Sequence, residues 1–209
     1  MKKNLLILFC ITLFTNKIHS QTNWELLNPK PTANTGKDVE FVTTNIGYII
    51  TSNELLETID AGSNWLKKQN ISSGNDMGFY NAIGYIVGNY GYILKSIDNG
   101  TSWSQVSTGF NHSYNTVNII DDNNVILSTS NSIVKTNDGG TTWESLSISN
   151  SAVNKTSFTS SLVGHAVCNN GIILKTIDGG QNWYTTKDDS NTSPSNYFTV
   201  YFINENIGF

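Results

Sequence analysis

Short apolar runs alternate along this chain with turns that are rich in Gly, Asn, Asp and Ser. Two of the runs are GYIVG (Gly84 to Gly88) and GYILKSI (Gly91 to Ile97), whose β-branched and aliphatic residues suit a pleated, packed surface. No segment sustains the 3.6-residue apolar period of an amphipathic helix. The pattern therefore predicts an all-β chain.

One turn pattern recurs four times: Ser or Thr, any residue, Asp, any residue, Gly, any two residues, and Trp. Its aspartates, Asp60, Asp98, Asp138 and Asp178, are spaced 38, 40 and 40 residues apart. That spacing is typical of one four-stranded propeller blade per repeat. We expect each repeat to contain three strands, this turn and a fourth strand, with the first strand innermost. The residues predicted to build the turns are Asp60, Gly62, Trp65, Asp98, Gly100, Trp103, Asp138, Gly140, Trp143, Asp178, Gly180 and Trp183.

The chemistry of this turn favours a structural role over catalysis. The Asp carboxylate can accept hydrogen bonds from backbone N–H groups, Gly supplies a positive φ, and the Ser or Thr hydroxyl can fix the turn from the other side. The Trp ring can then cover the turn, with its indole N–H free to reach a local acceptor. A motif that is repeated down the chain is more typical of a building unit than of a catalytic site.

The turn pattern resembles the Asp-box, or BNR repeat. The longer frame GIILKTIDGGQNW (Gly171 to Trp183) is similar to that of the photosystem II stability/assembly factor-like propellers and, more distantly, of sortilin-type propellers. This resemblance implies a β-propeller with the Asp-box between the third and fourth strands, on a rim away from the functional face. It also implies a partner that is bound through a basic, arginine-containing patch, and this chain departs from that pattern.

The ends of the chain differ from the repeats. Residues 1–20 combine a Lys pair, a short apolar run and a polar exit, which predicts a signal peptide and an exported protein that is secreted, periplasmic or at the cell surface. The apolar run is too short to span a membrane, so we expect no transmembrane segment. We expect a propeller domain over 21–209, and the partial blades at its two ends suggest a fragment of a longer propeller. The predicted repeats are about 37–70, 77–108, 115–149 and 153–187, with partial blade strands at 22–27 and 196–209.

Charge narrows the possible partners. All twelve basic residues are lysines, against 16 acidic residues. Without the three lysines of the leader, nine remain, which gives the mature chain a net charge of about −7. An acidic surface repels phosphate backbones, so we expect no nucleic-acid partner.

The absence of arginine also disfavours a sialidase, because that enzyme grips the substrate carboxylate with planar guanidinium groups that lysine cannot imitate. Other glycosidases need only two facing carboxylates. We interpret the acidic residues outside the box turns as solvated loop charges and predict no catalytic residue. These acidic residues include Asp38, Glu40, Asp76, Asp121, Asp122, Asp188 and Asp189.

No metal or cofactor is expected. His112 and His165 lie in different repeats, without cysteine or carboxylate at the spacing of metal ligands. Cys168 lies in an apolar strand without a CxxC partner, so we interpret it as a small buried residue. Lys95, Lys135 and Lys175 share one repeat position and are predicted to be solvated.

The positions that vary between repeats are where a ligand could be recognised. The connections between second and third strands, which by resemblance to other propellers lie opposite the boxes, carry amides suited to hydrogen bonding with a peptide or sugar. The five tryptophans are all committed to the repeat, and the other aromatic residues are more typical of a propeller core. The candidate ligand-face residues are Asn53, Asn89, Tyr90, Asn131, Asn169 and Asn170.

The sequence thus predicts an exported, non-catalytic propeller that binds or scaffolds a protein or cell-surface glycan. The alternative is a glycoside hydrolase whose catalytic carboxylates lie partly outside these residues. The Asp-box does not separate the two, because glycosidases, receptors and assembly factors all carry it.

Overall fold

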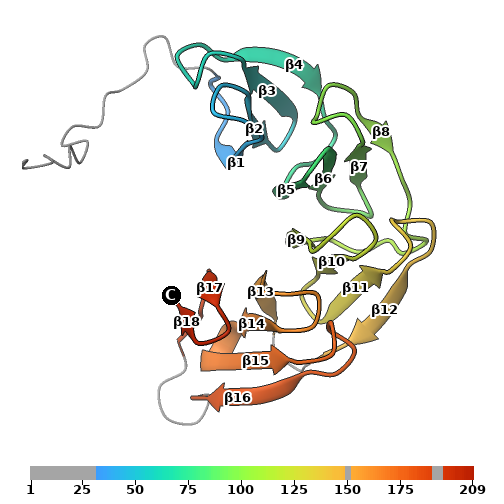
Figure 1. Ribbon diagram of the computed structural model, residues 1–209, viewed down its shortest axis with the longest axis vertical. Coiled ribbons are helices and arrows are strands. Elements are labelled where there is room, and N and C mark those ends of the chain that lie inside the picture. Colours follow the sequence, from blue (N-terminus) through green and yellow to red (C-terminus); the bar gives the residue numbers. More distant parts are fainter. Residues whose placement is uncertain (1–31, 149–151, 190–194) are drawn as a thin grey trace, which may run out of the picture.

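The computed structural model describes residues 32–148, 152–189 and 195–209. These residues form four antiparallel four-stranded sheets and one two-stranded hairpin, as the all-β prediction requires. The sheets stand side by side around an arc, with the first strand of each nearest the centre (Figure 1). This is the blade arrangement of a β-propeller. The predicted leader (1–20) and the predicted N-terminal strand (22–27) lie outside the described residues.

Each sheet follows chain order, so the innermost strand comes first and the outermost comes last. The first sheet contains β1 (Gly36–Phe41), β2 (Gly47–Thr51), β3 (Glu54–Thr58) and β4 (Leu66–Asn70). The second contains β5 (Asp76–Tyr80), β6 (Ile83–Val87), β7 (Ile93–Ser96) and β8 (Ser104–Gln105).

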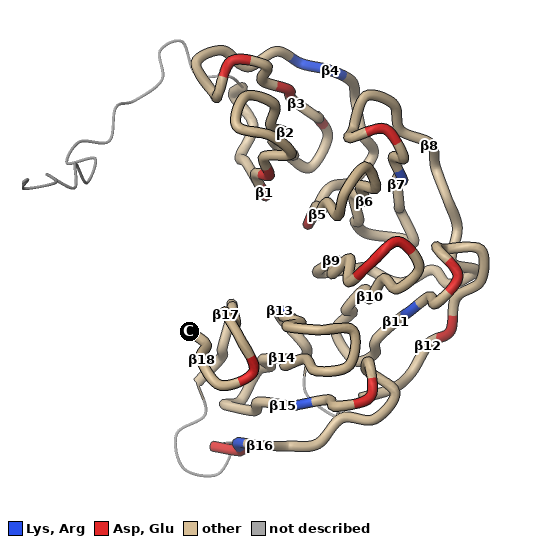
Figure 2. Tube along the Cα trace, viewed as in Figure 1, with Lys and Arg blue, Asp and Glu red and all other residues tan. Residues whose placement is uncertain are grey.

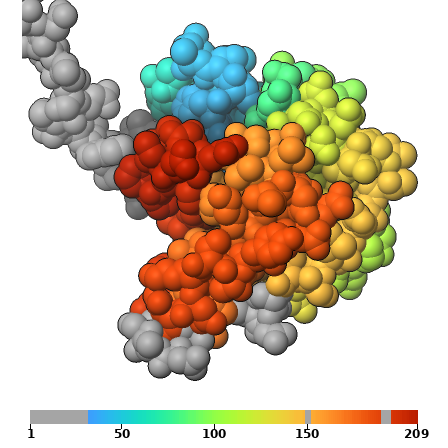
Figure 3. Space-filling model, turned by 60° about the horizontal axis from the view of Figure 1, so that its bottom comes forward, coloured from blue at the N-terminus to red at the C-terminus, as the bar shows by residue number. Residues whose placement is uncertain are grey.

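The remaining elements continue the same order. The third sheet contains β9 (Thr116–Ile119), β10 (Val125–Ser128), β11 (Ser132–Thr136) and β12 (Glu144–Ser147). The fourth contains β13 (Val153–Phe158), β14 (Gly164–Cys168), β15 (Ile172–Thr176) and β16 (Tyr184–Asp188), with a short 3-10 turn, η1 (Asn169–Gly171), between its middle strands. The C-terminal hairpin contains β17 (Phe202–Asn204) and β18 (Ile207–Gly208), and it packs against the fourth sheet (Figure 3).

The hydrophobic core lies between neighbouring blades. One cluster joins Tyr48 and Ile50 of the first blade to Met77 and Ile86 of the second. A second cluster joins Tyr85 and its neighbours to β9, β10 and β11 of the third blade. Because each sheet buries a face against the next sheet, no blade is independent of its neighbours.

The Asp-box turns show the hydrogen bonds that their chemistry suggests. In the second blade, Ser96 Oγ donates to Asp98 Oδ1 at 2.8 Å, and the Ser102 N–H donates to the same oxygen at 2.9 Å. The Gly100 N–H in turn donates to Ser96 Oγ at 2.8 Å, and Gly100 has a φ of +82°. The other three boxes repeat these bonds.

The boxes of the second and third blades also contact the preceding blade. The hydroxyl of Tyr48 in β2 donates to the Asn99 carbonyl in the box of the second blade at 2.9 Å, and that of Tyr85 in β6 donates to the Gly139 carbonyl in the third at 3.2 Å. A β-carbon on Gly100 would lie only 2.6 Å from the Tyr48 ring. The box glycine therefore provides both the turn and the space for the tyrosine of the neighbouring blade.

Two of the three lysines before the boxes, Lys95 and Lys135, are not solvated as predicted. Lys95 Nζ in β7 donates to the Gly139 carbonyl of the next blade at 2.7 Å. Lys135 in β11 is buried, and its ammonium lies 3.3 Å from Glu144. The long side chains place their charged ends at fixed acceptors while their stems lie along the sheet.

A Phe–Gly contact explains the Gly in the first or second position of three of the second strands, β2, β6 and β14. Phe79, near the end of inner strand β5, covers Gly84 so closely that a β-carbon there would lie 2.5 Å from the ring. The same ring meets Trp103 edge-on, with centroids 5.7 Å apart. Phe41 and Phe158 repeat both contacts in the first and fourth blades.

Candidate binding channel

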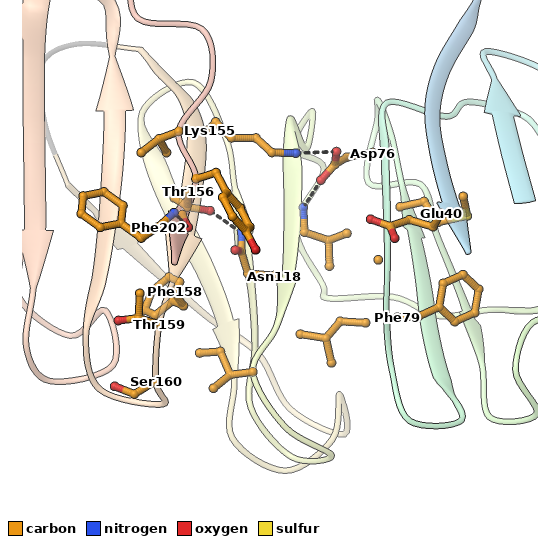
Figure 4. Close-up of a pocket in the computed structure, with 18 of the residues that line it drawn as sticks. Glu40, Asp76, Phe79, Asn118, Lys155, Thr156, Phe158, Thr159, Ser160 and Phe202 are labelled. Carbon is orange, nitrogen blue, oxygen red and sulfur yellow. Dashed lines mark hydrogen bonds and ion pairs between the residues drawn. The ribbon is translucent and has the colours of Figure 1, made fainter. Parts of the chain in front are cut away.

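The five inner strands β1, β5, β9, β13 and β17, with the residues next to them, line an open cavity of about 660 Å³ on the inside of the arc. This volume lies within the range that is typical of ligand sites. Figure 4 shows side chains from several blades turned toward this space. We call this cavity the channel.

Strand register decides which residues face the channel. Glu40, Gly78, Asn118 and Ser157 occupy the same position in their inner strands, opposite Tyr48, Tyr85, Ile126 and His165 of the second strands. All four of these inner-strand residues line the cavity. Since side chains alternate along a strand, this shared position faces the channel in every blade.

Two aspartates join neighbouring inner strands. Asp38 Oδ2 accepts the Met77 N–H at 3.0 Å, which links β1 to β5. Asp76 Oδ2 accepts the Val117 N–H at 2.8 Å, which links β5 to β9. Each carboxylate therefore satisfies a backbone donor of the next blade.

An ion pair crosses the channel wall between blades that are not adjacent in sequence. Lys155 Nζ of β13 lies 2.8 Å from Asp76 Oδ1 of β5 (Figure 4). Asp76 is only 6% exposed, and burial raises its pKa to about 6, although Lys155 and the Val117 N–H act in the opposite direction. The pair thus ties the second blade to the fourth, with its carboxylate buried and its lysine side chain about one third exposed.

Glu40 is the channel acid whose charged form is stabilised least by neighbouring groups. Burial, followed by the charges of Asp38 and Asp76, raises its pKa to about 6, and Lys155 offsets only part of this. Figure 2 places acidic positions on both β1 and β5 at the centre of the arc. The channel wall is therefore acidic where the first two blades meet it.

The rest of the channel wall includes apolar side chains. Phe79, Phe158 and Phe202 contribute aromatic rings, while Val117 and Ile119 contribute methyl groups. Phe202 also stacks on the His165 ring with centroids 3.8 Å apart, and its N–H donates to Ser157 Oγ at 3.1 Å. The cavity can therefore contact both a charged group and the hydrocarbon part of a ligand.

The interpretation of the seven acidic residues as solvated loop charges is wrong for Asp38, Glu40 and Asp76, which line the channel. For two of them the repeat spacing is the one signal in the sequence: Asp38 and Asp76 are 38 residues apart, as are the box residues Asp60 and Asp98, so they share a repeat position. Asp121 also lines the cavity, but its carboxylate accepts the N–H groups of Asn123 and Asn124 in a local turn.

The candidate ligand-face residues lie on the connections between second and third strands, one set per blade, and they do not converge on one cavity. Four of their amide oxygens already accept hydrogen bonds. Asn89 Oδ1 accepts from Asn75 at 2.9 Å and Asn169 Oδ1 from Asn154 at 2.8 Å, while Asn53 Oδ1 and Asn131 Oδ1 accept from the hydroxyls of Thr51 and Thr129. Tyr90 is 84% exposed. Asn53, Asn131 and Asn170 are exposed as well. Their role in binding remains a prediction.

Cys168, His112 and His165 do not line the channel. Cys168 is fully buried, and burial raises the pKa of its thiol to about 11. Among residues 32–148, 152–189 and 195–209, no group of three or more His, Cys, Asp or Glu side chains could hold a metal ion. The same residues contain no helix long and apolar enough to cross a membrane.

Comparison with known proteins gives one family and several similar folds. The family model described as photosynthesis system II assembly factor YCF48 matches residues 16–151. A solved structure of YCF48 bound to a D1 peptide is 18% identical, with a TM-score of 0.52 over 86% of this chain and 90% of that chain.

Two other solved structures share the fold. An ancestral GH74 enzyme is 12% identical, with a TM-score of 0.64 over 79% of this chain and 27% of that chain. The WD40 propeller domain of Doa1 is 11% identical, with a TM-score of 0.62 over 83% of this chain and 60% of that chain. No curated protein sequence matches this chain. At these identities the structural likeness supports the propeller fold and nothing further.

Proposed function

Because this chain belongs to the photosynthesis system II assembly factor YCF48 family, we propose that it is an exported, non-catalytic scaffold that binds a segment of a partner protein in the channel. The observation that carries the proposal is the cavity of about 660 Å³ formed jointly by five inner strands. A protein segment fits its mixture of charged, amide and aromatic groups better than a purely apolar ligand does. YCF48 has itself been solved with a bound peptide.

A peptide selection tests this proposal. Random heptapeptides displayed on phage are selected on the immobilised protein and are then tested against two variants. Gly78→Phe places a side chain in the channel, where a β-carbon would meet Val117 only at 3.6 Å, an ordinary contact. Tyr90→Ala removes the exposed aromatic of the amide-rich face and is the matched control.

We expect the selected peptides to lose binding to Gly78→Phe and to keep it with Tyr90→Ala. The reverse result would place binding on the face opposite the boxes. A selection that yields no specific peptide, together with specific binding on a glycan array, would replace the protein partner with a sugar.

Glycoside hydrolysis is the second candidate, and one observation favours it. Glu40 has a pKa raised to about 6 and lies in the channel with Asp38, as a general acid beside a second carboxylate would. Release of nitrophenol from a panel of aryl glycosides by the wild type, but not by Glu40→Gln, would support this activity. Equal background rates for both proteins would support the scaffold.

Export rests on the predicted leader at residues 1–20. The mature protein recovered from outside the cytoplasm should begin at Gln21. N-terminal sequencing of that protein checks the proposal, and a mature chain that retains Met1 would contradict it.

A further inference from the structure

The acidic side chains of the channel differ in the hydrogen bonds and ion pairs that they make. Asp38 accepts the N–H groups of Val39 and Met77, Asp76 accepts the Val117 N–H and pairs with Lys155, and Asp121 is held by its own turn. Glu40 lines the same cavity, yet within the described part of the chain its carboxylate has no hydrogen bond or ion pair. Figure 4 shows it turned into the channel, apart from the Lys155–Asp76 pair.

Negative charge exceeds positive charge around Glu40. Four carboxylates and one ammonium line the cavity, and that ammonium already pairs with Asp76. A ligand carboxylate or phosphate would add a further negative charge to this half-buried surface. A ligand cation would provide the counter-charge that Glu40 lacks.

The apolar wall specifies the shape of that cation. Phe79, Val117 and Ile119 line the cavity together with the acids. A long side chain that carries its charge at the tip can lay its hydrocarbon stem on such a wall while the tip reaches a carboxylate. Lysine and arginine have this form, whereas an inorganic cation has no stem.

We infer that the partner segment enters the channel through a lysine or arginine side chain, whose charged end binds Glu40 and whose stem packs against Phe79, Val117 and Ile119. This inference rests on the proposed peptide-binding function. It assigns the recognition group to this chain and the cation to the partner. Glu40 would then be the residue that selects among peptides that fit the channel.

The test uses the peptides selected on the wild-type protein. Each is made with a fluorescein label, once as selected and once with its lysines and arginines replaced by glutamine. Affinities for wild type, Glu40→Gln and Glu205→Gln are measured by fluorescence anisotropy. Glu205 is exposed and does not line the cavity, so Glu205→Gln makes the same charge change elsewhere.

We expect the selected peptides to be enriched in lysine or arginine. Replacing these residues should weaken binding to wild type and to Glu205→Gln about tenfold, the size of effect typical of one hydrogen bond to a charged group. The same replacement should change binding to Glu40→Gln by less than about twofold, because the partner of the cation is already absent. A cooperative urea unfolding curve for Glu40→Gln, with a midpoint at or above that of wild type, excludes misfolding as the cause.

Two outcomes overturn the inference, and they are distinguishable. In the first, peptides bind and Gly78→Phe blocks them, but the glutamine replacement in the peptide weakens binding to all three proteins equally, or to none of them. The channel then binds a protein segment without recognising a cation through Glu40. If no peptide is sensitive to Gly78→Phe, the proposed channel function fails and the inference fails with it.

Discussion

Carboxylate side chains have two opposite environments in this protein. In the Asp-boxes, hydrogen bonds from backbone and side-chain donors lower the pKa of Asp138 and Asp178 to about 2. In the channel, burial raises the pKa of Asp76 and Glu40 to about 6. The motif identifies the first group in the sequence, because the donors are local. The second group depends on which residues other blades place nearby, so no local pattern marks it.

The box glycine can be tested at the same scale. Gly100→Ala is expected to lower the free energy of unfolding by about 3 kcal/mol, because the alanine would keep a φ of +82° and place its β-carbon against the Tyr48 ring. Gly109→Ala is the control, since Gly109 has the same φ of +82° but no heavy atom within 4 Å of a β-carbon. That variant should lose only about 1 kcal/mol. Equal losses in urea unfolding would show that the contact between blades contributes nothing.

The channel acids predict a pH effect on stability. A group whose pKa is higher in the folded state binds more protons there, so its contribution is complete below its unfolded pKa and is lost as the pH rises through the folded value. For Asp76 and Glu40 that folded value is about 6. Lowering the pH from 7.5 to 5.5 should therefore stabilise wild type, relative to the Asp76→Asn, Glu40→Gln double variant, by on the order of 1 kcal/mol.

The comparison with the double variant is needed because other groups also titrate. Burial lowers the pKa of His165, which acts in the opposite direction over this interval but does so equally in both proteins. The box carboxylates, whose pKa values are lowered, lose their contribution only below about pH 4. Urea unfolding of both proteins at the two pH values measures the difference, and parallel pH profiles would contradict the assignment.

At the scale of the element, the strand pattern within a blade follows from the sequence, whereas the contacts between blades do not. The repeat spacing and the apolar runs predict four strands per unit with the first innermost. The register between blades depends on side chains that reach across to other repeats, such as Tyr48 to Asn99 and Asp38 to Met77. Hydrophobic alternation carries no information about these polar contacts.

A repeated asparagine shows how the inner strands are held together. Asn75, Asn115 and Asn154 each stand at the start of an inner strand and donate to a carbonyl of the next unit, those of Tyr114, Val153 and Tyr197. Asn115→Ala should lower the free energy of unfolding by about 1 kcal/mol, because the Val153 carbonyl loses a donor at 2.9 Å. Asn111→Ala, at an exposed position in the same connection, should change it by less than about 0.5 kcal/mol. Indistinguishable urea midpoints for the two variants would argue against this contact as a link between blades.

At the scale of the whole molecule, the channel results from the arc and belongs to no single blade. Each inner strand contributes two to four of the lining residues, and only their assembly makes a cavity of about 660 Å³. This is why the propeller could be predicted from the sequence while its candidate site was assigned to the variable connections. The amides there remain testable, but the channel is where the structure brings charged and aromatic groups together.

Methyl NMR measures the location of binding most directly. In protein labelled at the isoleucine δ-methyl groups, Ile119 lines the channel, whereas Ile59, Ile97 and Ile177 lie exposed at the box turns. Titration with a selected peptide should shift the Ile119 resonance and leave the three box isoleucines unchanged. Saturable shifts at the box isoleucines with Ile119 unmoved would contradict channel binding.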